Sequence, residues 1–289
     1  MSTAAACSRR PAGVPSVQVP LLPWHTTRDD KAAIRGLGTP TVSNLGELCR
    51  PGNNRRITIS WCVSLPSKTK LDQLGERLRQ RAVTDDDFRL LDAFRRSFAA
   101  GYEEVLDAIR SNLGSEPTGR PAKSTSSIIE KLQRETIRLT QIQDIAGCRL
   151  VVPHSSAQEQ TVTQLRGALD EVTVVDRRTH SSHGYRAVHL VVIADGKPIE
   201  IQVRTTLQHL WAEFSEKMAD VVDPAVKYGG GPEPVKKLLA GYSDLVKQME
   251  KLELMPAGAD QQQLKGLRQE IRQLLETAII EVSKTRSRK

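Results

Sequence analysis

Aromatic residues and cysteines are scarce in this chain of 289 residues, of which aromatic residues make up 4%. The four cysteines are Cys7, Cys49, Cys62 and Cys148, and none stands in a CxxC or Cys/His spacing typical of zinc. A structural zinc site is therefore not predicted. Cys148 lies in an apolar run and is predicted to be a small buried core residue. A reducing compartment, the cytoplasm, fits this use of cysteine best.

Long apolar segments are missing as well. No run of 18 apolar residues occurs, so neither a transmembrane helix nor a membrane partner is expected. Arg9 and Arg10 lie near the start without an apolar stretch behind them, and a secretory signal is not expected. No internal repeat is visible.

The charge balance is basic. The chain has 42 Lys and Arg against 34 Asp and Glu, a net charge of +8 and a pI near 9.4. Such a balance suits an anionic partner, such as a nucleotide, RNA or an acidic protein, without choosing among them. The excess could equally lie on solvated helices and tails.

Three regions are predicted along the chain. Residues 1–56 are rich in Pro, Gly, Thr and Ser and are expected to be mostly irregular. Residues 57–222 alternate helical and strand patterns, which indicates an α/β or α+β core around one sheet. Residues 223–289 contain a Gly-Gly-Gly-Pro linker and two long charged helices, at about 233–254 and 260–285.

Individual elements follow from caps and periodicity. Acidic residues after Thr84 favour a helix start, and apolar residues from Leu90 to Ile109 recur at helical spacing up to a break at 114–119. A capping-box pattern beginning at Ser127 predicts another helix start. The remaining expected elements are a short strand over 57–65, a helix from Lys70, strands over 145–152 and 172–176, and helices over 156–169 and 207–218.

Residues 184–189 and 199–205 are predicted to form two neighbouring strands joined by Asp195-Gly196. Alternate residues of a strand share a face, so Tyr185 and His189 are expected on one side. The second strand has an apolar face, expected in the core, and a polar face, where a functional site is expected. The apolar face comprises Ile199, Ile201 and Val203, and the polar face comprises Glu200, Gln202 and Arg204.

The side chains of this strand pair allow more than one interpretation. Tyr185 could stack on a nucleobase or be a half-buried aromatic residue of the sheet. His189 could serve a ligand or be a hydrogen-bonded core histidine. Glu200 could bind a metal ion or act as a general base.

A basic group surrounds the predicted helix start near Ser127. A helix N-terminus with nearby cations suits phosphate oxygens, although charged helix faces are also commonly solvated. The members of this group are Arg120, Lys123, Lys131 and Arg134.

Asp144 stands at the mouth of the apolar strand predicted over 145–152. A carboxylate there could hold Mg²⁺, which prefers one or two carboxylates plus substrate phosphates. It could equally cap the strand or form an ion pair with Arg149.

Four ordered motifs resemble the synthetase domain of the RelA/SpoT-type alarmone synthetases. They lie within residues 85–220 and occur in the expected order, near the expected spacing. They are Arg120, Lys123, Ser127, Ile128, Lys131 and Leu132; Asp144 and Arg149; Gly184, Tyr185, Arg186 and His189; and Glu200, Gln202 and Arg204.

The resemblance implies a nucleotidyltransferase-like α+β fold, a mixed sheet flanked by helices, with residues 223–289 as a C-terminal helical extension. It implies transfer of pyrophosphate from ATP to the 3′-hydroxyl of GDP or GTP, which makes (p)ppGpp and AMP, with Mg²⁺ as cofactor. The chain looks like a small, stand-alone synthetase without hydrolase or regulatory domains.

The resemblance also assigns residues to ATP. Arg120 and Arg149 would embrace the adenine. Lys123, Lys131 and Arg134 would hold the phosphates. These five residues form the expected ATP site.

The remaining matched residues would serve the metal ion and the acceptor. Asp144 and Glu200 would bind Mg²⁺, and Glu200 would also take the proton from the attacking hydroxyl. Tyr185 would stack on the acceptor base, with His189 near the acceptor's phosphates. The residues expected to support this face are Gln202 and Arg204.

Three features depart from the family pattern. Arg120 and Lys123 are one residue further apart than usual. Ser-Ser-His at 181–183 replaces a basic-Pro-Asn sequence before the Gly-Tyr pair. Strand parity puts Asp144 and Arg149 on opposite faces unless Asp144 lies just before the strand.

Two alternatives remain open from the sequence. One is a toxin, paired with an antitoxin protein, that uses the same chemistry on tRNA 3′ ends or adenine nucleotides. The other is a degenerate module that only binds nucleotide or RNA. The C-terminal helices could serve tRNA or a homo-oligomer, and their basic residues are Lys265, Arg268, Arg272, Lys284, Arg286, Arg288 and Lys289.

Overall fold

The computed structural model describes residues 66–255 and 260–286. The chain divides into two units, Met1–Thr58 and Ile59–Lys289, and the described residues all belong to the second. The predicted irregular segment over 1–56 and the predicted strand over 57–65 lie outside the described residues. The division of the rest into regions 57–222 and 223–289 stays a prediction.

One mixed sheet of five strands organises the described unit. Its order is β1-β2-β5-β4-β3, with β2 and β5 parallel and the other neighbours antiparallel. The predicted α+β class with a mixed sheet flanked by helices is therefore confirmed. The strands are β1 (Thr118–Arg120), β2 (Ala146–Val152), β3 (Thr173–Asp176), β4 (Val188–Ala194) and β5 (Lys197–Thr205).

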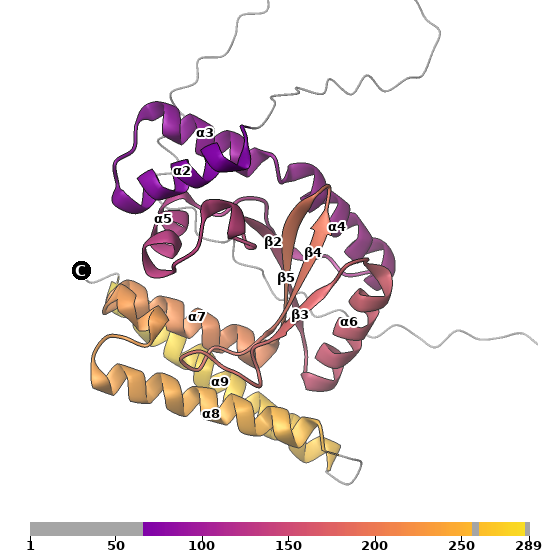
Figure 1. Cartoon of the computed structure of the whole chain (residues 1–289). Coiled ribbons are helices and arrows are strands. Elements are labelled where there is room, and N and C mark those ends of the chain that lie inside the picture. Colours follow the sequence, from indigo (N-terminus) through magenta and orange to yellow (C-terminus); the bar gives the residue numbers. More distant parts are fainter. Residues whose placement is uncertain (1–65, 256–259, 287–289) are drawn as a thin grey trace, which may run out of the picture. The chain divides into compact units, whose positions relative to one another are not determined.

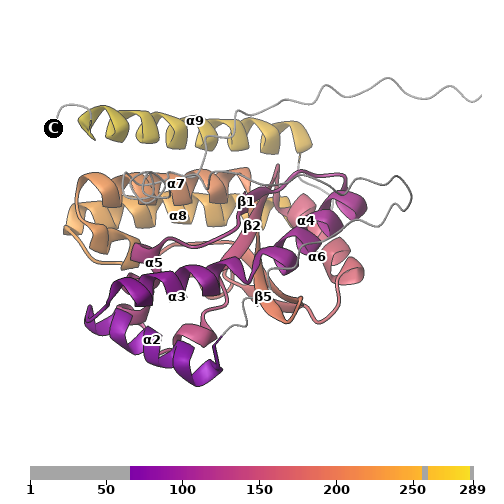
Figure 2. The same cartoon turned by 90° about the horizontal axis from the view of Figure 1, so that it is seen from above.

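Along the chain, helices lie before the first strand, between strands and after the last strand. In both Figure 1 and Figure 2 the last three long helices, α7, α8 and α9, run side by side, and each contacts the other two, so they form a bundle. The helical elements are α2 (Lys68–Gln80), α3 (Asp85–Arg96), α4 (Ala99–Leu113), α5 (Thr125–Arg134), η1 (Leu139–Gln141), α6 (Ser155–Ala168), α7 (Thr206–Val221), η2 (Pro224–Tyr228), α8 (Glu233–Glu253) and α9 (Gln261–Arg286).

Two apolar cores hold these layers. The first joins one face of the sheet to α4, α6 and the helices before them. It contains Ile199, Ile201 and Val203, each completely buried, which confirms the apolar face predicted for β5. The second core lies between α7, α8 and α9 and contains residues such as Trp211 and Phe214. The polar face of β5 is therefore left for a site.

A side-chain cap fixes one helix start where the sequence predicts it and moves another. Thr84 accepts a hydrogen bond from the Asp87 N–H, and the Asp87 carboxylate accepts one from the Thr84 N–H, a complete capping box. The start predicted at Ser127 is wrong by one turn. The α5 helix begins at Thr125, because the Ser124 hydroxyl accepts from the Ser127 N–H and acts as the cap.

Two further predictions are corrected. The single helix expected up to Ile109 is two helices, α3 and α4, separated at Ser97 and Phe98. The segment expected only as a break at 114–119 contains β1 after the helix end at Gly114. β1 pairs with β2 and brings Arg120 opposite Gly147.

The β4–β5 hairpin forms as predicted. Its two turn residues have positive φ, 47° at Asp195 and 67° at Gly196, as a tight twisted hairpin requires. The first strand begins at Val188 rather than near Gly184, so Tyr185 lies in the loop before it. That loop turns back on itself, with the Tyr185 N–H donating to the Ser182 carbonyl.

Cys148 is buried in β2 as predicted, and burial raises the pKa of its thiol to about 12. Within residues 66–255 and 260–286, every helix is too short or too polar for a membrane span.

Candidate active site on the polar face of the sheet

Asp144 lies between η1 and β2, two residues before the strand starts. The Lys123 Nζ donates to one carboxylate oxygen at 2.7 Å, and the Lys131 Nζ donates to the other at 2.9 Å. Arg120 donates to the Asp144 carbonyl at 2.9 Å, and its guanidinium is 3.9 Å from the carboxylate. We call these four residues the Asp144 cluster.

The backbone explains why Arg120 and Lys123 converge despite their unusual spacing. Arg120 is the last residue of β1 and pairs with Gly147 of β2. The chain then turns, and the Lys123 N–H donates to the Ile145 carbonyl. The extra residue is thus accommodated in the turn, and both cations reach Asp144.

The charge in this cluster is unbalanced, since three cations face one carboxylate. Burial raises the pKa of Asp144, but the charges and hydrogen bonds of Lys123 and Lys131 outweigh it and lower the pKa far below its usual range. Burial lowers the pKa of Lys123, and the neighbouring cations lower it further while Asp144 opposes the shift. The cluster therefore has capacity for further negative charge.

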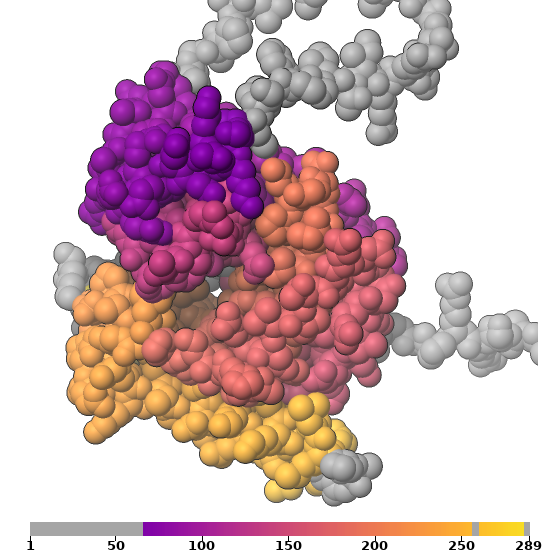
Figure 3. Space-filling model, viewed as in Figure 1, coloured from indigo at the N-terminus to yellow at the C-terminus, as the bar shows by residue number. Residues whose placement is uncertain are grey.

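Arg134 does not join the Asp144 cluster. Its guanidinium lies over the ring of Tyr228, 3.9 Å from the ring centroid, and pairs with Glu135 at 2.8 Å. Arg134 thus connects the end of α5 to η2. Figure 3 shows a hollow in the surface between the magenta segment around α5 and the orange segment that follows α7.

The second group lies on β4, β5 and the loop before them. The sheet register pairs Gln202 with both Arg149 and His189, and pairs Glu200 with Gly147. Directly paired residues share a face of the sheet, so the predicted polar side chains do gather on one face. Gly147 is needed there, because a Cβ would lie 2.5 Å from the Glu200 carbonyl oxygen.

Five side chains form a closed hydrogen-bonded circuit. Glu200 lies 2.9 Å from the His189 Nδ1 and accepts from the Gln202 amide at 2.7 Å. The His189 Nε2 lies 2.8 Å from the Tyr185 hydroxyl. Arg204 closes the circuit by donating to the Tyr185 oxygen at 2.9 Å and to the Gln202 carbonyl at 2.8 Å. We call these residues the Glu200 circuit.

The circuit keeps Glu200 ionised and oriented. Burial raises the pKa of Glu200, and the hydrogen bond and charge of His189 lower it to a net value below the usual one. The negative charge of Asp144 raises the pKa of Glu200, so the two carboxylates interact electrostatically. Burial raises the pKa of Tyr185, whose hydroxyl therefore remains protonated.

His209 is a site residue that sequence reasoning missed. Its Nδ1 lies 3.4 Å from the Arg149 Nη1 and must be the acceptor, because arginine only donates. Burial, with the charges of Arg149 and Arg204, lowers the pKa of His209 to about 4. Burial also lowers the pKa of Arg149, to about 9. The only signal in the sequence is the place of His209 in the first turn of the helix after β5.

These observations define an α+β domain in which two partly buried carboxylates, several cations and a tyrosine gather on and beside one face of a mixed sheet. Residues 119–219 match the family model described as "Region found in RelA / SpoT proteins". The chain therefore contains the region found in RelA/SpoT proteins, and the predicted family resemblance is confirmed over residues 119–219.

Two relatives match part of the chain. A Mycobacterium tuberculosis protein, named only as uncharacterized, is 38% identical over 117 residues, which cover 39% of this chain and 42% of that protein. A probable chloroplastic GTP diphosphokinase of Arabidopsis thaliana is 34% identical over 96 residues, 32% of this chain and 14% of that protein. The chain thus spans less than half the length of these relatives.

Solved structures of small alarmone synthetase 1 from Bacillus subtilis are also similar. One is 24% identical with a TM-score of 0.44, over 63% of this chain and 99% of that chain. Another, bound to its product pppGpp, is 27% identical with a TM-score of 0.40, over 53% of this chain and 91% of that chain.

Proposed function

We propose that this domain transfers pyrophosphate from ATP to the 3′-hydroxyl of GDP or GTP, releasing AMP and forming (p)ppGpp. The observation that carries the proposal is a pair of partly buried carboxylates in contrasting surroundings. Asp144 lies among surplus cations, and Glu200 lies in a hydrogen-bonded circuit. The name of the Arabidopsis relative, a probable GTP diphosphokinase, supports the same reaction class.

The Asp144 cluster is proposed to receive ATP. Phosphoryl transfer depends mainly on positioning and on neutralising phosphate charge, and Lys123 and Lys131 supply that charge. Their present partner is a single carboxylate, so arriving phosphates would complete the pairing. Arg120 and Arg149 are proposed to hold the adenine.

The donor set suits Mg²⁺. Among the described residues, no three His, Cys, Asp or Glu side chains come together as metal ligands, and the candidate ligands in the site are the two carboxylates of Asp144 and Glu200. Two carboxylates with substrate phosphates and water are the ligands that Mg²⁺ prefers. Asp144 and Glu200 would hold the ion, which when bound neutralises phosphate charge and acidifies a neighbouring hydroxyl.

The Glu200 circuit is proposed to handle the acceptor and its proton. A general base must be ionised and fixed in direction, and the hydrogen bonds from His189 and Gln202 meet both needs. Glu200 would take the proton of the 3′-hydroxyl as its oxygen attacks the β-phosphorus of ATP. The bond from that phosphorus to the α,β-bridging oxygen breaks, and AMP leaves. Tyr185 is proposed to contact the acceptor base.

An acceptor panel tests the proposal. Purified protein is incubated with γ-labelled ATP, Mg²⁺ and either GDP, GTP, ATP alone or tRNA, and the products are separated by thin-layer chromatography and gel electrophoresis. Label on GDP or GTP together with AMP is expected. Label on tRNA, or on an adenine nucleotide product other than the ATP supplied, with none on guanine nucleotides, would show that the acceptor is not GDP or GTP. No AMP with any acceptor would refute the reaction.

The tRNA alternative depends on a free basic surface at the C-terminus. In the described part of α9, Arg268 pairs with Glu253, Arg272 with Glu276, and Lys284 with Glu281. These ion pairs reduce the charge that α9 could offer to a phosphate backbone. We therefore favour a free guanine nucleotide as acceptor.

A further inference from the structure

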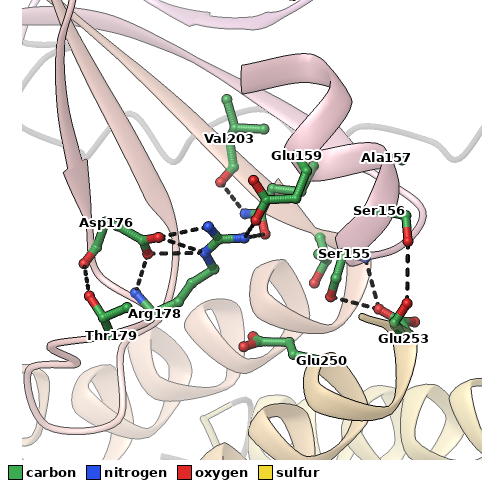
Figure 4. A network of polar contacts seen from close by, with 12 residues as sticks. Ser155, Ser156, Ala157, Glu159, Asp176, Arg178, Thr179, Val203, Glu250 and Glu253 are labelled. Carbon is green, nitrogen blue, oxygen red and sulfur yellow. Dashed lines mark hydrogen bonds and ion pairs between the residues drawn. The ribbon is translucent and has the colours of Figure 1, made fainter. Parts of the chain in front are cut away.

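The loop that carries Tyr185 is held at both ends. This β3–β4 loop (residues 177–187) is closed at its neck by the Arg177 N–H, which donates to the Ala187 carbonyl at 2.9 Å. Near the first end, Arg178 pairs with Asp176 at 2.6 Å and with Glu159 at 2.7 Å, as Figure 4 shows. The loop therefore has a defined conformation, because hydrogen bonds and ion pairs with other residues of the protein hold it.

At the other end of the loop, the anchor comes from α8. The Arg186 Nε lies 3.0 Å from both carboxylate oxygens of Glu250, and both side chains are more than nine-tenths buried. Residues 186 and 250 are far apart in the sequence, so this pair joins the loop directly to the C-terminal helices. A buried charge without its partner is costly, and each member therefore fixes the other.

Glu250 also connects the loop to the end of β5. The Gln208 amide donates to Glu250 at 2.8 Å, and the Gln208 carbonyl accepts from the Thr205 N–H and from Gln158. Gln158 in turn donates to the Val203 carbonyl and accepts from Arg178. The buried network therefore reaches both residues that flank Arg204 in the chain.

A second contact from α8 reaches the residue before Tyr185. The Ser243 hydroxyl donates to the Gly184 carbonyl at 2.8 Å. Gly184 has a φ of 88°, and a Cβ there would lie 2.8 Å from the Trp211 ring and 3.1 Å from Ser243. Only glycine allows the loop to approach α7 and α8 this closely.

We infer that Glu250 and Ser243 of α8 are positioning residues for the acceptor. They hold Arg186 and Gly184, the two chain neighbours of Tyr185, and so set where the tyrosine ring stands against the acceptor base. The C-terminal helices thus take part in acceptor recognition without touching the substrate. This inference rests on the proposed function only in naming what Tyr185 contacts.

Kinetics of two variants test the inference. Glu250→Gln leaves Arg186 without a buried countercharge and is expected to raise the KM for GDP on the order of tenfold. Ser243→Ala removes one neutral hydrogen bond and is expected to raise it about threefold. Neither variant should change the KM for ATP, because the Asp144 cluster lies on other elements. Glu250→Asp, which retains the charge, should recover part of the loss.

Glu253→Gln is the matched control. Glu253 is also a buried carboxylate of α8, but it pairs with Arg268 and accepts from Ser155 at the start of α6, away from the loop (Figure 4). It should leave the KM for GDP unchanged. An equal rise in the KM for GDP and for ATP, or the same effect from Glu253→Gln, would overturn the positioning role.

Hydrogen–deuterium exchange separates this inference from the proposed function, because it needs no substrate. In Glu250→Gln and Ser243→Ala, amides within 179–186 should exchange faster than in the wild type, and in Glu253→Gln they should not. Unchanged exchange in both test variants would overturn the inference even in an active enzyme. An inactive wild-type protein would refute the reaction and leave the exchange result to decide whether α8 holds the loop.

Discussion

Asp144 and Glu200 are both largely buried carboxylates of one site, but opposite kinds of partner hold them. Asp144 stands before β2 among cations from β1, the following turn and α5. Glu200 stands in mid-strand and is held by a histidine and an amide from the same sheet face. The surroundings of Asp144 carry surplus positive charge, whereas the hydrogen bonds around Glu200 fix the orientation of its carboxylate.

The difference matches two separate chemical needs. A phosphate-binding group needs charge that is not yet neutralised, whereas a general base needs an ionised oxygen with a defined orientation. Flexible lysine side chains suit the first need, and side chains rooted in neighbouring strands suit the second. Each carboxylate can therefore be tested by a different measurement.

The largest effect is expected from Glu200→Gln. The amide keeps the shape and can still hydrogen-bond, but it cannot accept a proton, so kcat should fall about 10³-fold. Circular dichroism melting should show a retained fold. Rates of AMP release near those of the wild type would remove Glu200 from the mechanism.

Asp144→Asn should affect ATP binding and turnover differently from Glu200→Gln. Turnover with Mg²⁺ should fall about 10²-fold, because a proposed metal ligand loses its charge. Affinity for ATP without metal should instead rise about fivefold, since a negative charge near the phosphates is removed. Calorimetry with ATP in EDTA measures this, and Glu200→Gln serves as the comparison. A weaker metal-free affinity in Asp144→Asn would contradict the charge surplus at this cluster.

Lys131→Met and Arg134→Met form a matched pair on α5. Lys131 contacts Asp144, whereas Arg134 lies over Tyr228. The KM for ATP should rise about tenfold for Lys131→Met, from the loss of a charge-assisted hydrogen bond, and stay within about twofold for Arg134→Met. Equal losses in the two variants would show that Arg134 turns toward ATP in the working enzyme.

Acid should lower the free energy of unfolding through His209. The pKa of His209 falls from 6.5 in the free side chain to about 4 in the folded protein, so the unfolded chain binds the proton more readily in this window. Stability from this group is present above pH 6.5 and is lost as the pH falls toward 4, by about 3 kcal/mol at most.

Urea unfolding of the wild type and His209→Asn at pH 7, 5.5 and 4 measures this contribution. The difference in unfolding free energy between the two proteins should shift in favour of the variant as the pH falls. A constant difference across the three pH values would mean that His209 titrates normally in the folded protein.

The elements that sequence predicts well are those with a regular apolar pattern or an acidic first turn. Ile199, Ile201 and Val203 alternate with polar residues and lie in the core, and α3 starts after Thr84 as its acidic first turn predicts. β1 escapes prediction because three residues cannot show a period. Its pairing with β2 is set by tertiary contact.

Within the site, the sequence predicts which residues take part but not which of them contact one another. Helical spacing places Lys131 and Arg134 near each other, but only packing decides that one meets Asp144 and the other Tyr228. The Arg186–Glu250 pair joins segments distant in sequence, and no local pattern marks it. His209 likewise gains its shifted pKa from burial beside Arg149, which the chain order does not reveal.

Phosphorus NMR of one reaction containing the wild-type protein, ATP, GDP and Mg²⁺ tests the proposed pyrophosphate transfer most directly. We expect AMP and a guanine nucleotide with a 3′-diphosphate to appear together in equal amounts, with no ADP. Accumulation of ADP or inorganic phosphate instead, without a 3′-diphosphate product, would contradict it.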